Sequence, residues 1–137
     1  MKLRFGRCLS LFLRQQGMIV PMSQSDTVRL YVDLFNARKF TKMGELFAEE
    51  SLWESPSPTP GTRGRSAIIA RYSAMADAGI DMMMTITNLY EQGNVVVAEI
   101  VTSTTDGPVG RVADVFEIDE EGRILRMTGY AGPPRLN

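Results

Sequence analysis

Residues 110–123 read GRVADVFEIDEEGR, and this stretch decides the fold. Its alternating apolar residues and the turn-forming EEG predict a β-strand that ends in a tight turn. On that alternation Asp114 shares a face with Val112, Phe116 and Ile118, so a carboxylate lies within an apolar stripe. Burying an unpaired ionised carboxylate costs several kcal/mol. Asp114 therefore either holds a proton or accepts hydrogen bonds from structural donors, unless a shifted register turns it to water.

The rest of the chain places this strand in a sheet. Long strand patterns cover residues 82–92, 94–105, 109–119 and 123–132, separated by turn signals such as DGP. Helical patterns precede them, from Ser25 or Asp26 to about Arg38, over 41–48, and from Arg65 or Ser66 to about Ala78. A brief strand over 52–55 ends at a proline-rich loop. Helices followed by an antiparallel meander predict an α+β fold.

Two tyrosines are expected to point toward the same interior as Asp114. Tyr31 and Tyr72 lie on the apolar sides of the first and third predicted helices. A curved sheet covered by helices on one face encloses a pocket, where the three polar groups would converge. The alternative is that both tyrosines are ordinary core aromatics whose hydroxyls bind water or backbone.

Composition narrows the chemistry. The chain has 137 residues, enough for one domain, and 15 Lys and Arg balance 16 Asp and Glu without a run of like charge. Nothing indicates a nucleic-acid partner, and a small neutral ligand fits better. With one cysteine, Cys8, and no histidine, intrachain disulfides, Cys/His zinc sites and histidine triads are excluded. Proton transfer must therefore fall to Asp, Glu, Tyr or Lys.

The N-terminal segment is expected to lie outside the fold. Residues 1–21 contain a basic start and a short apolar patch interrupted by Ser10, with no small-residue cleavage site after it. We expect an extension, with the domain over 22–137, rather than a signal peptide. No segment approaches the ~20 apolar residues that span a membrane, and a cytoplasmic location is expected.

Three stretches resemble a known family: YVDLFNARKF at 31–40, FAEESLWESPSPTPGTRGRSAIIARY at 47–72 and ADVFEIDEEGRI at 113–124. They are similar to the ketosteroid isomerases of the nuclear transport factor 2-like and SnoaL-like superfamily. The resemblance implies a cone-shaped α+β fold, with a curved antiparallel sheet wrapped around three helices, and a homodimer. It also implies that Tyr31 and a protonated Asp114 form an oxyanion hole supported by Tyr72.

The resemblance breaks at the catalytic base. The family's proton-shuttling aspartate falls on Ser55, and serine is too weakly basic for that task without an activating base. Glu54 faces the other way by alternation. Glu99 is the better replacement if its face of VVVAEIV points inward; otherwise it pairs with a neighbouring Lys or Arg.

The expected ligand is a small apolar molecule, steroid-like or polycyclic, and no metal or organic cofactor is expected. Allylic isomerisation through an enolate is the leading hypothesis. The alternatives are a binding module that has lost catalysis, or a SnoaL-like enzyme of another reaction. Epoxide-hydrolase and cyclase variants of the fold are disfavoured, because Ile100, Thr102 and Gly129 stand where such enzymes carry charged groups. The side chains expected against the ligand are Phe35, Phe47, Trp53, Ile69, Val97, Val101 and Phe116.

Overall fold

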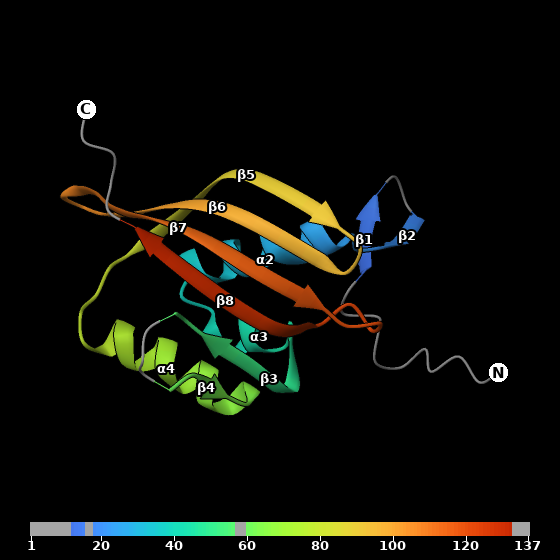
Figure 1. The fold of residues 1–137 in the computed structure, drawn as a ribbon, viewed down its shortest axis with the longest axis horizontal. Coiled ribbons are helices and arrows are strands. Elements are labelled where there is room, and N and C mark those ends of the chain that lie inside the picture. Colours follow the sequence, from blue (N-terminus) through green and yellow to red (C-terminus); the bar gives the residue numbers. More distant parts are fainter. Residues whose placement is uncertain (1–11, 16–17, 57–59, 133–137) are drawn as a thin grey trace.

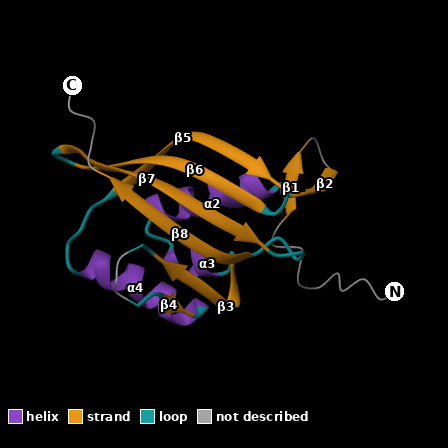
Figure 2. Cartoon of the chain, in the orientation of Figure 1, coloured by secondary structure: helices purple, strands orange, loops and turns teal. Residues whose placement is uncertain are grey.

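A six-stranded sheet forms the body of the protein (Figures 1 and 2). This computed structural model describes residues 12–15, 18–56 and 60–132, with side chains from residue 22 onward. The strands follow one another across the sheet in the order β4, β3, β8, β7, β6, β5. Their bounds are Phe47–Glu54 for β3, Thr62–Arg63 for β4, Met83–Gln92 for β5, Val95–Thr104 for β6, Gly107–Ile118 for β7 and Ile124–Gly132 for β8.

The sheet is mixed, which corrects the expectation of a purely antiparallel sheet. Strands β5 to β8 form the predicted antiparallel meander. Strand β3, however, runs parallel to β8. A helix and four strands separate β3 from β8 along the chain, so no tight turn dictates an antiparallel pair. The α+β class is confirmed.

Three helices cover one face of the sheet (Figure 1). They are α2 over Gln24–Asn36, α3 over Phe40–Gly44 and α4 over Arg65–Asp77. Helix α2 begins earlier than predicted, because Ser23 and Asp26 form a capping box in which each side chain accepts the other's backbone N–H, at 3.1 and 3.3 Å. Helix α3 ends at Gly44, short of the predicted 48, and Phe47 already begins β3.

Gly44 lets α3 and α4 pack closely. A Cβ at this position would overlap the side chain of Ile69. Ile69 is half-buried against α3 and does not line the cavity between α4 and the sheet, so its expected place against a ligand is wrong.

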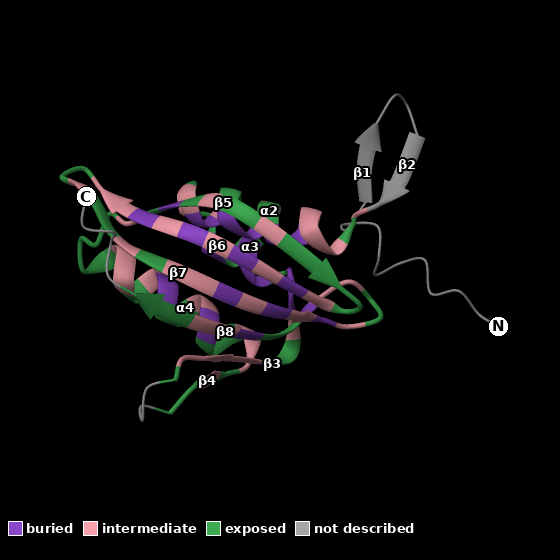
Figure 3. Ribbon diagram, turned by 45° about the horizontal axis from the view of Figure 1, so that its top comes forward, coloured by how far each residue is buried: buried purple, intermediate pink, exposed green. Residues whose placement is uncertain are grey.

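The strands alternate between a buried and a less buried face, as the stripes along β6 and β7 show (Figure 3). On β7, Asp114, Phe116 and Ile118 are buried and Val112 is half-buried, so the predicted face is correct. On β6 the buried residues are Val96, Ala98, Ile100 and Thr102. The helix-covered core therefore lies on the face that includes Asp114.

Residues N-terminal to α2 form a separate feature. Strands β1, Phe12–Gln15, and β2, Met18–Pro21, pair with each other and not with the six-stranded sheet. That residues 1–21 lie outside the fold stays a prediction. Residues 1–11, which include Cys8, lie outside the part of the chain that the structure describes. Within the described part of the chain, no helix is both long and apolar enough to cross a membrane.

Candidate functional site

A cavity of about 610 Å³ lies between the sheet and helices α2 and α4. Small-molecule sites typically measure roughly 300–1,000 Å³ and are mostly apolar, with a few placed polar groups. The apolar lining includes four methionines, whose flexible and polarisable side chains adapt to varied ligand shapes. The lining residues are Tyr31, Phe35, Trp53, Ser55, Arg71, Tyr72, Ala74, Met75, Ile80, Met82, Met84, Thr102, Val112, Asp114, Met127, Gly129 and Ala131.

Asp114 is the carboxylate of this cavity. It lies on β7 between Ala98 of β6 and Gly129 of β8, and only 5% of its surface is exposed. Both neighbours are small; a Cβ at Gly129 would lie 3.0 Å from Oδ1 of Asp114. Small neighbours leave room for the carboxyl group to face the cavity rather than pack against side chains.

Burial raises the pKa of Asp114 from its ordinary 3.8 to about 7. The cause is loss of water, which disfavours the charged form. Among the described residues, no hydrogen bond or ion pair reaches this carboxyl group. Of the two outcomes expected for a buried acid, proton uptake fits better than structural hydrogen bonding. Near neutral pH a large share of the molecules carries an O–H donor here.

Tyr31 and Tyr72 meet inside the cavity. Their hydroxyl oxygens lie 2.6 Å apart, which joins α2 to α4 by a hydrogen bond. Tyr31 is 1% exposed, and burial raises its pKa, with Tyr72 and Asp114 adding to the effect. Burial raises the pKa of Tyr72 as well. Both hydroxyls therefore stay protonated, and since the pair uses one proton internally, the second can be donated to a ligand.

The aromatic packing around Tyr31 fixes its position. Phe47 and Phe116 pack edge-on against its ring, with centroids 5.9 and 5.4 Å away. These two phenylalanines were expected against the ligand, but they are core residues behind Tyr31 and do not line the cavity. Phe35 does line it.

Ser55 lies at the cavity directly after β3, with Trp53 beside it in the lining. The carboxylate of the neighbouring Glu54 is engaged by other residues, because it pairs with Arg126 of β8 and accepts a 3.4 Å hydrogen bond from Thr128. Among the described residues no hydrogen bond joins the Ser55 hydroxyl to a carboxylate, and the chain has no histidine that could activate it. The position of the family's base is therefore occupied by a group that cannot take a proton from carbon unaided.

Glu99, Val97 and Val101 lie on the opposite face of the sheet from the cavity. The buried face of β6 is formed by the alternate residues, so these three point away from the helices. Asn88 donates a 3.0 Å hydrogen bond to the carboxylate of Glu99. The placement of Glu99 as an inward second acid is wrong, and so is that of the two valines against a ligand in this cavity. The sequence could not choose the face, because both faces of VVVAEIV are apolar.

Arg71 was missed by sequence reasoning. It lines the cavity from α4, and its guanidinium carbon lies 3.9 Å from the centroid of the Trp53 ring. The sequence signal was the spacing of Arg71 and Met75, four residues apart and thus on one helix face. The contact with Trp53 depends on tertiary packing and could not be predicted.

No cluster of three or more metal-ligating side chains occurs in the part of the chain that the structure describes. Among the described residues that line the cavity, Asp114 is the one with a carboxylate that could bind a cation. We therefore assign no metal role to these residues.

Comparison with known proteins identifies a family and several structures of the same fold. The family model of the SnoaL-like domain matches residues 28–127. The comparison with curated proteins gives no match.

Solved structures give the same fold at low sequence identity. A provisionally assigned ketosteroid isomerase from Kribbella flavida superposes with a TM-score of 0.68, at 21% identity over 83% of this chain and 81% of that one. An NTF2-like protein of unknown function from Cytophaga hutchinsonii gives 0.70, at 15% identity over 85% and 96%. SalBIII, named as an epoxide hydrolase/cyclase-like enzyme, gives 0.69, at 19% identity over 80% and 90%. These similarities show the fold alone.

Proposed function

The chain belongs to the family of SnoaL-like domains, and from that premise we propose that its cavity binds a steroid-like or polycyclic ketone and stabilises the enolate formed in allylic isomerisation. The observation that carries this proposal is the meeting of the neutral acid Asp114 and the hydrogen-bonded tyrosine pair in one apolar cavity. The provisional ketosteroid isomerase among the structural neighbours agrees with it.

The ligand class follows from the shape and polarity of the cavity. A volume of about 610 Å³ accommodates a fused-ring molecule, and the methionines suit a rigid apolar body. The polar groups at the buried end require one oxygen that accepts hydrogen bonds. A polycyclic ketone has this combination of properties.

In the proposed reaction a water molecule, standing in for the carboxylate that Ser55 replaces, takes the proton from the carbon between the carbonyl and the double bond, and the electron pair moves onto the carbonyl oxygen. Tyr31 or its partner Tyr72 donates one hydrogen bond to that oxygen, and Asp114 donates a second. A preorganised donor of this kind lowers a barrier by roughly 3–4 kcal/mol. The proton then returns at the far end of the allylic system, and the double bond becomes conjugated with the carbonyl.

Ser55 sets the limit on this activity, since it stands where a carboxylate would take and return the proton. We expect native turnover of a β,γ-unsaturated ketosteroid to be weak. The same observation favours a second candidate function, a binding module that keeps the donors and has lost catalysis. The two candidates share the ligand and differ in turnover.

The first experiment titrates the protein with an equilenin-like phenol, an analogue of the enolate, and follows ligand fluorescence. Native protein should bind it, and Asp114→Asn should retain most of the affinity because an amide still donates. Asp114→Leu should weaken binding by about 1–3 kcal/mol, the cost of losing one partner of a charged acceptor. Equal binding by Asp114→Leu, or no binding by native protein, would end the proposal.

The second experiment measures isomerisation. Ser55→Asp should raise turnover, since it restores a carboxylate at the cavity, while Ser66→Asp on the exposed start of α4 is the matched control. Turnover that rises only with Ser55→Asp supports the isomerase. Phenol binding without turnover in either variant supports the binding module. Glu99→Gln should change neither property, because Glu99 faces away from the cavity.

A further inference from the structure

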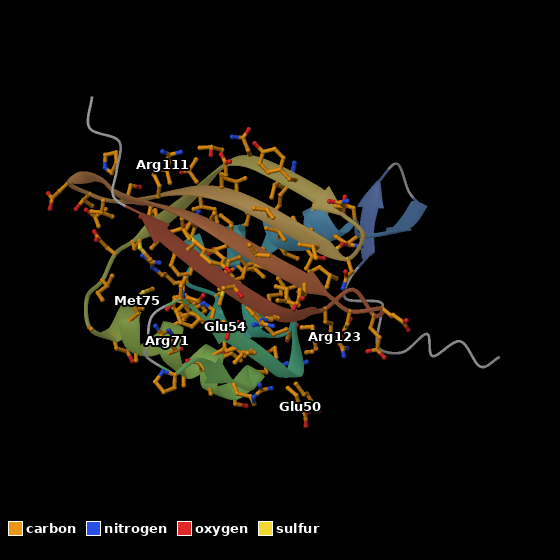
Figure 4. The ribbon with its side chains drawn as sticks, viewed as in Figure 1. Glu50, Glu54, Arg71, Met75, Arg111 and Arg123 are labelled. Atoms are coloured by element: carbon orange, nitrogen blue, oxygen red, sulfur yellow. The ribbon has the colours of Figure 1, made fainter. Side chains whose placement is uncertain are left out.

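Arg71 is the one cation among the described residues that line the cavity. It lies on α4 one turn before Met75, and both side chains line the same space (Figure 4). Arg71 is exposed, whereas Tyr31, Tyr72 and Asp114 are buried. Arg71 therefore marks the solvent-facing rim, and the three polar groups mark the interior end.

The stacking of Arg71 on Trp53 leaves its donors free. The guanidinium carbon lies 3.9 Å from the ring centroid, so the contact is made by the face of the planar group. The N–H groups of a guanidinium lie in its plane, in a fork that matches a carboxylate. In the described part of the chain no carboxylate pairs with Arg71 and no carbonyl accepts from it.

The cavity thus has polar groups on its buried side and at its exposed rim, and apolar side chains make up most of the rest of its lining. The interior end offers hydrogen-bond donors to one oxygen, and the rim offers a positioned cation. Met75 lines the cavity from α4, and Met82 and Val112 add to the apolar lining. A ligand that fits every part of this surface has an oxygen at one end of an apolar body and a negative charge at the other.

We propose that the natural ligand is a polycyclic carboxylic acid, whose ring oxygen binds at Tyr31 and Asp114 and whose carboxylate pairs with Arg71 at the rim. This inference rests on the proposed function for the position of the ring oxygen and adds the substrate class. The stack on Trp53 holds the guanidinium in place, so a planar carboxylate is bound through two parallel hydrogen bonds. Phosphate or sulfate would meet a single fork without a second cation.

A purely structural role of Arg71 is the competing interpretation, in which its stem and guanidinium only cover Trp53. Loss of that cover would affect all ligands of the cavity alike. Recognition of a carboxylate affects only ligands that carry one. A pair of ligands equal in shape and different in charge separates the two interpretations.

The experiment compares 6-hydroxy-2-naphthoate with 6-hydroxy-2-naphthamide, titrated by intrinsic ligand fluorescence into native protein, Arg71→Met, Arg71→Lys and the exposed control Arg29→Met of α2. Native protein should bind the acid at least about tenfold more tightly than the amide, because a charge-assisted hydrogen-bonded pair raises affinity by roughly tenfold or more. Arg71→Met should abolish that preference and leave the amide within about threefold. Arg71→Lys should keep part of it, and Arg29→Met all of it.

The outcomes also separate this inference from the proposed function. Equal weakening of both ligands by Arg71→Met, or a native protein that binds the acid no better than the amide, overturns the carboxylate inference. If Asp114→Leu leaves the affinity for both ligands unchanged, the proposed enolate site is wrong. A preference for the acid that depends on Arg71 would still support the carboxylate inference. Absence of acid binding to native protein overturns the inference outright.

Discussion

Replacing Asp114 by asparagine is expected to stabilise the protein, and the gain should grow with pH. Burial raises the pKa of Asp114 from 3.8 to about 7, so between these values the folded chain keeps a proton that the unfolded chain has lost. The free energy of unfolding therefore falls as pH rises through this window, by about 1.4 kcal/mol per pH unit. Below 3.8 the effect is absent, and above 7 it is complete.

The magnitude follows from that window. At pH 5 the carboxyl group costs the folded state about 2 kcal/mol, and at pH 8 about 4 kcal/mol. The side chain is only 5% exposed, so solvent screening reduces these values little. Asparagine has the same shape and no ionisation, and no described residue hydrogen-bonds the carboxyl group that it replaces. The variant should therefore gain about 2 kcal/mol over native protein at pH 5 and about 4 kcal/mol at pH 8.

Urea unfolding followed by circular dichroism at pH 5, 6, 7 and 8 measures these differences. Asp33→Asn is the matched control, since Asp33 is exposed on α2 and the same change of charge there should alter stability by less than about 0.5 kcal/mol. If the difference between Asp114→Asn and native protein is the same at pH 5 and pH 8, Asp114 titrates alike in the folded and unfolded chain. The argument for a neutral donor in the cavity would then be refuted.

Three further predictions concern the cavity, the outer face and the N-terminal segment. Tyr31→Phe should weaken binding of the equilenin-like phenol by about 1–3 kcal/mol in calorimetry, because the hydroxyl that donates to the ligand is lost together with its 2.6 Å hydrogen bond to Tyr72; unchanged affinity would show that Tyr31 is not the donor. The outer face of the sheet, with Tyr90 and Tyr130 about half exposed, should mediate a homodimer in sedimentation at micromolar concentration, and Val97→Arg should dissociate it; a monomeric native protein would contradict this. Deleting residues 1–21 should leave the melting temperature within a few degrees, as measured by differential scanning fluorimetry, because β1 and β2 pair only with each other; a large loss would place the segment within the fold.

Periodicity determined much of this site in advance. Helical spacing turned Tyr31 and Tyr72 inward, and strand alternation did the same for Asp114, because in each case one face is clearly more apolar than the other. Glu99 could not be placed in this way, since valines and isoleucine occupy both faces of β6. The buried residues of β6 are those that pair with Asp114 and its same-face neighbours on β7, and this pairing could not be predicted from sequence.

Longer-range features were beyond the sequence for a different reason. The parallel pairing of β3 with β8 joins segments some 70 residues apart, and no turn signal encodes it. The stack of Arg71 on Trp53 depends on the packing of α4 against β3, which no local signal encodes either. In the sequence Arg71 is recognisable only as an arginine on a helix, and its place at the rim of the cavity becomes visible only in the folded structure.

The cost of Asp114 to stability and its use as a donor have one physical cause. Removal of water from the carboxyl group raises its pKa, and the same dry surroundings strengthen a hydrogen bond from its proton to a developing enolate. A leucine at this position would remove the cost and the donor together. Small residues at 98 and 129 keep the carboxyl group open to the cavity, which core packing alone would not require. The buried carboxyl group without a partner lowers the stability of the free protein, and a ligand oxygen that accepts its hydrogen bond offsets part of this loss. This holds whether or not a base is present to complete a reaction.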